Sequence, residues 1–402
     1  MAYSSSPQAF FKAFKETLVS HFFGVGGLAA GFIIAWQLGI FQSFPWAIAV
    51  YPTILTAEEV ISALFSGRLN TRLHIGTISP TFSGNMGTLW RLLQPVLTIT
   101  MMTSVLMSAI SIVFGGLFWR VAFTDFPNIL VVVVATMNLG LTLVLFALPI
   151  TFTAFRKGLD LDSVAYPIIA TVADIFITAC YTLMLYLFLD LHAPGKYLVL
   201  LIASLPTIFM IYALPRNIHD EEFVRAVKAS MLGLTLVAFI ANVAGSVLQR
   251  INVLTNSRKE ILTVYPASIE LVGDAGSVIG STAATKFALG LLKPSFSAIR
   301  GHVAQLSGAW ATSAISFAFF SISSLLLTGT FTLHAFSTLT YTLLVANAIA
   351  LILTVLVAYA FAILTFQKGL DPDHFVVPVE TSIAGAVTSI ALLAALLLTK
   401  LI

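Results

Sequence analysis

Six carboxylic acids lie in otherwise apolar stretches of the sequence, and no lysine or arginine occupies the middle of any of these stretches. The acids are Glu58, Glu59, Asp174, Glu270, Asp274 and Glu380. An ionised side chain at the centre of a bilayer costs about 2.5 to 3.5 kcal/mol on insertion scales, so each acid needs compensation. A bound cation, water in a cavity or protonation of the carboxyl could supply it. The acids are therefore the first candidates for a functional site.

Helical geometry places several of these acids on polar faces. At 100° per residue, Pro167, Thr171 and Asp174 lie on one side of a helix. Two further stripes are predicted, Thr56, Glu59, Ser62 and Ser66 in one stretch and Glu270, Asp274, Ser277 and Ser281 in another. Such stripes could line an aqueous path. The same carboxyls could also be protonated and hydrogen-bonded in a structural role.

Two pairs of glycines suggest different roles. Gly273 and Gly276 flank Asp274, which predicts a helix that unwinds and offers backbone carbonyls to a cation. Gly27 and Gly31 are spaced for close approach of two helices, and packing is the expected role there.

The composition excludes a soluble domain, because 58% of the residues are hydrophobic and only 9% are charged, with a mean hydropathy of +0.99. Stretches of about 20 apolar residues predict an all-α polytopic membrane protein. Eleven spans are expected, near residues 18–41, 44–66, 95–119, 128–153, 164–189, 197–215, 231–253, 261–285, 304–328, 337–366 and 376–399. Basic residues such as Arg68, Arg156 and Arg216 predict a cytoplasmic N-terminus. The net charge of +3 includes no basic tract for nucleic acid.

The chain contains the same pattern twice. The segment from Lys157 to Asp162 recurs from Lys368 to Asp373, and Val50-Tyr51-Pro52 recurs as Val264-Tyr265-Pro266. We call the sequence separation of Val50 from Val264 the first repeat offset, and that of Lys157 from Lys368 the second repeat offset.

The duplication predicts two homologous five-span repeats, residues 1–195 and 230–402, joined by a linking span and a cytoplasmic linker over 196–229. Because five is odd, the linking span keeps the two repeats parallel. A monomer is then expected to act as a pseudo-dimer in the bilayer.

No motif in the sequence predicts enzymatic chemistry or a bound cofactor. The seven histidines show no i, i+4 pairing, and the single cysteine, Cys180, excludes an intramolecular disulfide. The first apolar stretch is long enough to remain a membrane anchor, so no removable signal is expected.

The motifs resemble the MgtE-type family of magnesium transporters, most closely its tandem members. The likeness rests on the span from Pro52 through Arg68-Leu-Asn70-Thr71 to Gly76, and on Asp162, Pro167 and Asp174. In the second repeat it rests on Asp371-Pro372 and on Gly273-Asp274-Ala275-Gly276. The resemblance implies transport of divalent cations, chiefly Mg²⁺, between two five-span units, without the cytoplasmic sensor domains of longer members.

Two departures from the family pattern predict an asymmetric cation path. Glu59-Val60 stands where the family has Gly-Asn, and Gly385 stands in place of a second pore aspartate. The expected ligands of the transported Mg²⁺ are Asp174, Asp274, Glu270, Glu59, Glu58, Thr171 and Glu380. This oxygen set suits a hard divalent cation. The alternative is a proton- or sodium-coupled carrier of another solute that uses the same acids.

Overall fold

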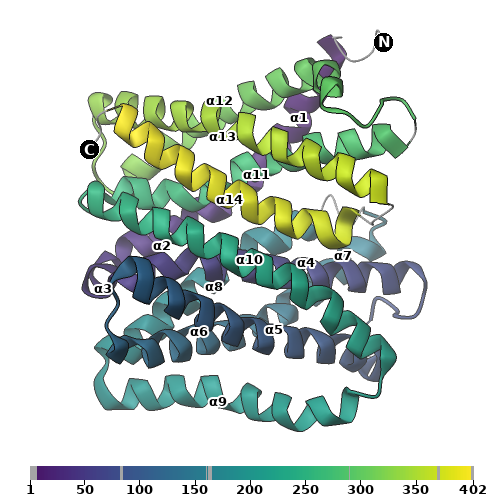
Figure 1. Ribbon diagram of the computed structural model, residues 1–402, viewed down its shortest axis with the longest axis vertical. Coiled ribbons are helices and arrows are strands. Elements are labelled where there is room, and N and C mark those ends of the chain that lie inside the picture. The colour runs from purple at the N-terminus through teal and green to yellow at the C-terminus, as the bar shows by residue number, and fades with distance from the viewer. Residues whose placement is uncertain are drawn as a thin grey trace. The chain divides into compact units, whose positions relative to one another are not determined.

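The computed structural model describes residues 7–81, 85–159, 161, 165–288, 290–368 and 372–399, and every regular element in them is helical (Figure 1). The first group of helices is α1 (Pro7–Phe23), α2 (Val25–Trp36), α3 (Leu38–Ser43), α4 (Pro45–His74), α5 (Met86–Phe114), α6 (Phe126–Gly140), α7 (Val144–Arg156) and α8 (Tyr166–Leu185). The second group is α9 (His192–Asn217), α10 (Glu221–Leu254), α11 (Lys259–Ala288), α12 (Val303–Leu327), α13 (Leu333–Lys368) and α14 (Pro372–Leu398). Short 3₁₀ or π turns lie at Gly115–Trp119, Phe123–Asp125, Leu141–Leu143, Tyr186–Asp190 and Phe296–His302.

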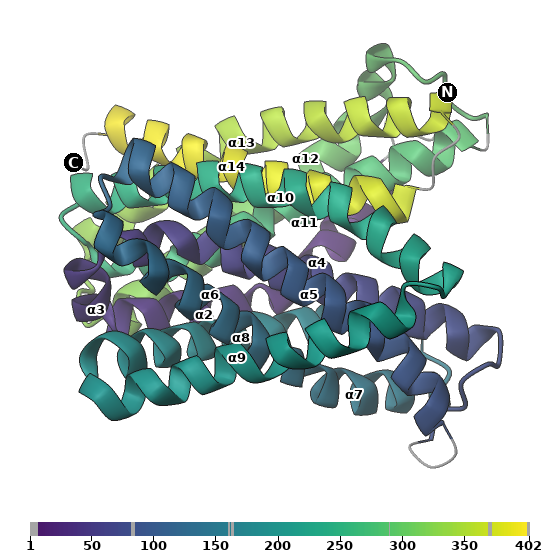
Figure 2. The same cartoon turned by 60° about the horizontal axis from the view of Figure 1, so that its bottom comes forward.

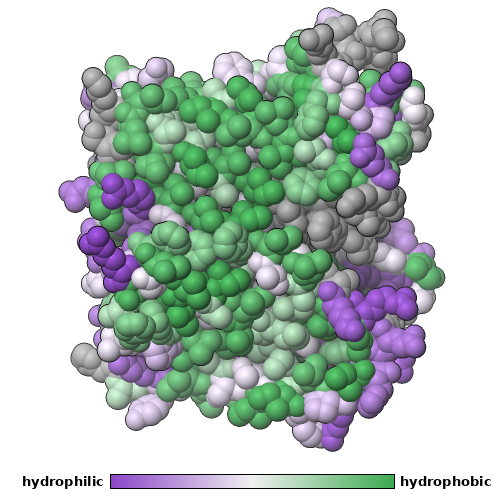
Figure 3. Space-filling view, in the orientation of Figure 1, coloured by the Kyte–Doolittle hydropathy of each residue, from purple (hydrophilic) through white to green (hydrophobic). Residues whose placement is uncertain are grey.

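Nine helical stretches of the described chain are long and apolar enough to cross a membrane. Two of the eleven expected spans are not among them. The helix α11 carries Glu270 and Asp274 along its length, and the described side chains of α14 form the apolar stretch Ser382–Leu398. Hydrophobic side chains cover the lengths of the visible helices in Figure 3, and hydrophilic ones gather near helix ends. This distribution is typical of helices that cross a bilayer.

The helices form two compact units that do not follow the order of the sequence. Unit 1 contains residues 1–38 and 247–402, and unit 2 contains residues 39–246. The chain therefore passes from one unit to the other at the start of α3 and again within α10. The predicted repeats 1–195 and 230–402 describe sequence similarity, and their boundaries stay a prediction. Each compact unit draws helices from both predicted repeats.

Within unit 1, α1 and α2 pack against α11 and α12, and α13 runs beside α14 (Figures 1 and 2). Within unit 2, α4 packs against α5 and α8, and α6 lies between α8 and the peripheral helix α9. Only 6% of the residues in the apolar stretch of α9 are buried, so most side chains of this helix are exposed on the surface of the protein.

The helices α4 and α11 have matching boundaries. The helix α4 runs from Pro45 to His74, and α11 runs from Lys259 to Ala288. The first repeat offset separates their first residues and also their last residues. Both helices contain an internal proline, Pro52 or Pro266, and both are followed by a glycine with positive φ, 80° at Gly76 and 68° at Gly290. Glycine tolerates this left-handed conformation, which ends a helix. The repeated glycine thus stops both helices at the same point.

Glycine also permits one close helix crossing in each unit. In unit 1, a side chain at Gly27 or Gly31 would overlap the backbone of α11 at Ala267 or Thr263. In unit 2, a side chain at Gly245 of α10 would overlap the carbonyl oxygen of Ala49 on α4. The first repeat offset separates Gly31 from Gly245 and also Ala49 from Thr263. The packing role predicted for Gly27 and Gly31 is confirmed.

The membrane orientation stays a prediction, and chemical labelling tests it. Cys180 is buried, so a variant with Cys180→Ser and Ile218→Cys carries one exposed thiol between α9 and α10. We expect a membrane-impermeant maleimide to label this thiol from the cytoplasmic side alone, because basic residues follow the positive-inside rule. A matching variant with Leu333→Cys, at the exposed start of α13, should be labelled from the outside. The reverse pattern would overturn the predicted topology.

Candidate functional site

In unit 2, two tyrosines fix the pairing of α4 with α8. The hydroxyl of Tyr51 lies 3.1 Å from that of Thr178, and Tyr181 donates a hydrogen bond of 2.6 Å to the carbonyl of Ala47. The rings of Tyr51 and Tyr181 stack between the helices. The two contacts run in opposite directions along the helices, so α4 and α8 are antiparallel. Two turns beyond Tyr51, the same register brings Glu58 level with the part of α8 that contains Thr171 and Asp174.

Glu58 and Asp174 form a buried acidic pair. Both side chains are buried, with exposed fractions of 5% and 9%, and they lie on α4 and α8, which pack against each other. Ser62, one turn further along α4, donates a hydrogen bond of 2.6 Å to Glu58. Thr171 is half-buried and donates to the carbonyl of Pro167 at 2.8 Å. The register of α4 on α8 therefore places three predicted residues, Glu58, Thr171 and Asp174, at a similar level of the two helices.

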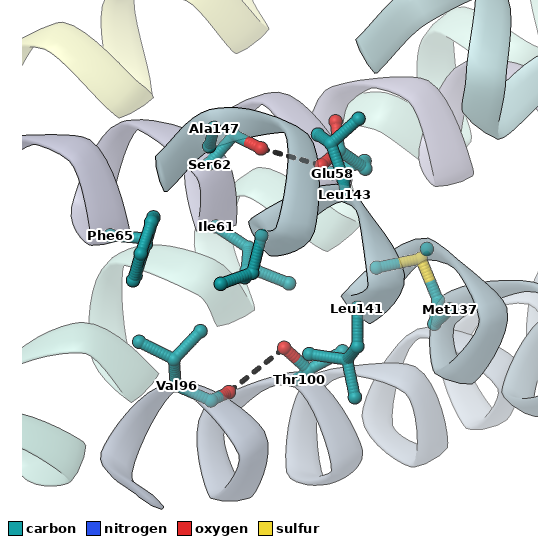
Figure 4. A pocket seen from close by; sticks show the side chains of 12 residues that line it. Glu58, Ile61, Ser62, Phe65, Val96, Thr100, Met137, Leu141, Leu143 and Ala147 are labelled. Atoms are coloured by element: carbon teal, nitrogen blue, oxygen red, sulfur yellow. Dashed lines mark hydrogen bonds between the residues drawn. The ribbon is translucent and has the colours of Figure 1, made fainter. Parts of the chain in front are cut away.

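A small internal cavity adjoins Glu58 (Figure 4). Its volume is about 20 Å³, which is enough for one water molecule. Its polar lining comes from Glu58, Ser62 and Thr100, and its walls are apolar, with Ile61, Phe65, Val96, Met137, Gly140, Leu141, Leu143, Val144 and Ala147. Thr100 donates a hydrogen bond of 2.8 Å to the carbonyl of Val96. The oxygen of this hydroxyl still has a lone pair to offer a water in the cavity.

In unit 1, the acids of α11 face the N-terminal helices. Ser20 of α1 donates a short hydrogen bond of 2.5 Å to Asp274. One turn away, a carboxylate oxygen of Glu270 lies against Gly24 and Gly27, where an added Cβ would stand 3.3 Å and 2.8 Å from it. The two glycines therefore leave room for the Glu270 carboxylate in a tight helix crossing. His21, which is buried, bonds to Ser316 of α12 at 3.1 Å.

The two units differ at equivalent points of their crossings. At the first repeat offset, Ser20 corresponds to Leu234, and Asp274 corresponds to Val60, both in unit 2. Leu234 and Val60 belong to one buried apolar cluster with Ile99 and Val237. In the same way Asp174 corresponds to Gly385, at the second repeat offset. The acidic positions of one unit are thus apolar or small in the other.

One expectation from the sequence differs from the structure. The helix α11 is continuous through Gly273 and Gly276, so the predicted unwinding next to Asp274 is wrong. Each glycine weakens a helix by only about 1 kcal/mol, less than the cost of freeing backbone groups in an apolar environment. Ser62, which shares the predicted stripe with Glu59, donates its hydrogen bond to Glu58. Residues i and i+4 lie about 40° apart around a helix, closer than the separation of about 60° between i and i+3.

Two further candidates from the sequence are Glu59 and Glu380. Glu59 is half-buried and lies about 100° around α4 from Glu58. The side chain of Glu380 lies outside the described residues, as do Asp160, Asp162 and Asp371. Among the described residues, no group of three or more His, Cys, Asp or Glu side chains is close enough to hold a metal ion. Any cation held here would therefore depend on two carboxylates, with hydroxyls, backbone carbonyls or water as further ligands.

Ser20 and Thr100 are site residues that the sequence did not indicate. Ser20 lies in the first predicted span, and its sequence neighbours do not identify α11 as its partner. Thr100 resembles any helical threonine bonded to its own backbone. The first repeat offset shows which helices are equivalent in the two repeats, but it does not show which helix each of them packs against.

Comparison with known proteins gives one match, and it covers the helices that carry Glu58 and Asp174. None of the curated proteins and none of the solved structures matches the chain. Residues 51–184, which run from Tyr51 of α4 to the end of α8 and include Glu58, Thr171 and Asp174, match the family model of MgtE, described as a divalent cation transporter.

Proposed function

We propose that this protein carries divalent cations across a membrane and that Mg²⁺ is its main substrate. The observation that carries the proposal is the burial of Glu58 and Asp174 on the packed helices α4 and α8, inside the segment that matches the divalent cation transporter family. Two buried carboxylates repel each other, and a divalent cation between them removes both charges at once.

The donor set of unit 2 suits Mg²⁺. This ion takes oxygen ligands, gives up its water reluctantly and is usually held by one or two carboxylates with several waters retained. Asp174 and Glu58 supply carboxylates, and Thr171 supplies a hydroxyl oxygen one turn from Asp174. The cavity beside Glu58 has room for one water. A water molecule that the ion retains as a ligand could thus lie in this cavity and hydrogen-bond to its polar lining while the ion passes.

We further propose that the path runs between two five-helix repeats of one chain. Matching contacts support the repeat: Tyr51 bonds to Thr178, and Tyr265 bonds to Ser389 at 2.7 Å. The first repeat offset separates the two tyrosines, and the second separates the two hydroxyl residues. The equal boundaries of α4 and α11 support it too. One chain would then supply both sides of the path.

Glu270 and Asp274 would form a second group of ligands for the transported ion. They have no acidic counterparts in the first repeat, where Thr56 and Val60 occupy the equivalent positions. The acids of the two repeats are thus not at equivalent positions. An ion would therefore meet different ligands in the two repeats.

Flux measured in liposomes tests the proposal. Purified protein is reconstituted with a Mg²⁺ indicator inside, and Mg²⁺, Mn²⁺ or Ca²⁺ is added outside. We expect Mg²⁺ entry that depends on the protein and saturates with concentration. A sodium or pH gradient is then imposed in separate experiments. If no divalent cation enters and an organic solute moves with protons or sodium instead, the coupled-carrier alternative replaces this proposal.

A further inference from the structure

The junction between α9 and α10 in unit 2 forms an open groove of about 620 Å³. Its lining is Ile218, His219, Glu221, Val224, Arg225 and Lys228. The lining thus contains two cations, a histidine and one carboxylate. Asp220, the other described acid of the junction, accepts a hydrogen bond from the backbone N–H of Phe223 and caps the start of α10.

The two cations of the groove are available to a ligand. Arg225 and Lys228 are both exposed, and within the described chain neither side chain takes part in a hydrogen bond or an ion pair. They stand three residues apart on α10, so both project from the same side of the helix. By contrast, the guanidinium of Arg216 at the end of α9 already lies over the ring of Tyr212, 3.7 Å from its centre.

The groove lies where two candidate membrane spans meet the water. The span in α9 ends at Asn217 and the span in α10 begins at Phe223, so the groove residues occupy the boundary between apolar and polar surroundings. Hydrophilic side chains gather at this junction in Figure 3. Beyond it, exposed apolar side chains continue along both helices, including Ile208 and Ile211 of α9 and Leu232 and Leu236 of α10. Acyl chains of a lipid could follow these surfaces.

We infer that this groove binds the headgroup of an anionic phospholipid. The phosphate would lie between Arg225 and Lys228, because arginine and lysine at the membrane surface attract phosphate groups. The acyl chains would extend along the apolar sides of α9 and α10. A free phosphate would use the same cations but none of the apolar surface, and the exposed apolar side chains next to the groove therefore favour the lipid.

Native mass spectrometry of the full-length protein in detergent tests this inference, with phosphatidylglycerol and phosphatidylcholine added in equal amounts. We expect wild type to retain phosphatidylglycerol about tenfold more than phosphatidylcholine, and the variant R225Q/K228Q to lose this preference. The control R156Q/K157Q removes two exposed cations at the end of α7 and should behave as wild type. The charge-preserving variant R225K/K228R should keep most of the preference.

Three results would overturn the inference. One is an unchanged preference in R225Q/K228Q, and another is equal retention of the two lipids by wild type. The third is full competition by soluble glycerol phosphate, which would assign the groove to a free phosphate. If the double variant does not fold, Lys228→Gln alone gives the same comparison with a smaller expected loss. The measurement requires no transport, so its outcome is independent of the proposed cation flux.

Discussion

Replacing Asp174 by asparagine is expected to lower Mg²⁺ flux in liposomes ten- to a hundred-fold. Asparagine keeps the shape and one oxygen of the side chain but removes its charge. A charge-assisted contact contributes about 1.5 to 3 kcal/mol, which corresponds to this range in affinity. The equivalent position in the second repeat is Gly385, so no symmetry-related carboxylate can compensate. Flux is measured with an entrapped Mg²⁺ indicator at equal amounts of inserted protein.

The matched control for this variant is Asp190→Asn. Asp190 lies in the π turn that follows α8 and is exposed, so the same chemical change occurs beyond the end of the same helix, away from the acidic pair. We expect flux close to wild type from it. Glu58→Gln should also reduce flux, since Glu58 is the buried partner of Asp174. Wild-type flux from Asp174→Asn would remove this residue from the path and move attention to Glu270 and Asp274.

Adding one methyl group to either crossing glycine should destabilise the protein strongly. In Gly245→Ala, the new Cβ would overlap the carbonyl oxygen of Ala49, and in Gly31→Ala it would overlap that of Thr263. Backbone atoms cannot turn aside as a flexible side chain can, so the two helices must separate. Overpacking of this kind costs about 1 to 3 kcal/mol. Thermal unfolding in detergent, followed by the fluorescence of the five tryptophans, measures the effect.

Gly233→Ala is the control for this comparison. Gly233 lies on α10, the same helix as Gly245, and an added Cβ there meets no atom within 4 Å. Because alanine favours a helix over glycine by up to about 1 kcal/mol, this variant should unfold at the same temperature as wild type or higher. Similar unfolding temperatures for Gly233→Ala and Gly245→Ala would show that the crossing is not tightly packed.

Residue types and helical periodicity predicted the helical class and the polar face of α8, because both depend on local spacing. The sequence indicated Glu58, Thr171 and Asp174 as candidates, and the structure packs the helices that carry them, α4 and α8, against each other. Spacing could not decide between Glu58 and Glu59, since both lie within about one turn of Ser62. Only the packing of α4 on α8, fixed by the contact of Tyr51 with Thr178, makes that choice.

The partners of α1 and α2 could not be predicted from the sequence. Gly27 and Gly31 indicated that another helix comes close, but small residues do not specify which helix. The prediction of unwinding at Gly273 was wrong for a related reason. Glycines lower the cost of breaking a helix, but the local sequence does not show whether the helical hydrogen bonds of the backbone are kept, as they are in α11. Long-range pairings of this kind depend on the tertiary structure.

The division of unit 1 between the two ends of the chain imposes an order on biosynthesis. Residues 39–246 are made between its first segment and its last, and at about 5 to 20 residues per second this takes roughly 10 to 40 s. During that interval the glycine face of α1 and α2 has no α11 to pack against. Unit 2 can be completed first, and α1 and α2, although made before it, then find their partners only after it.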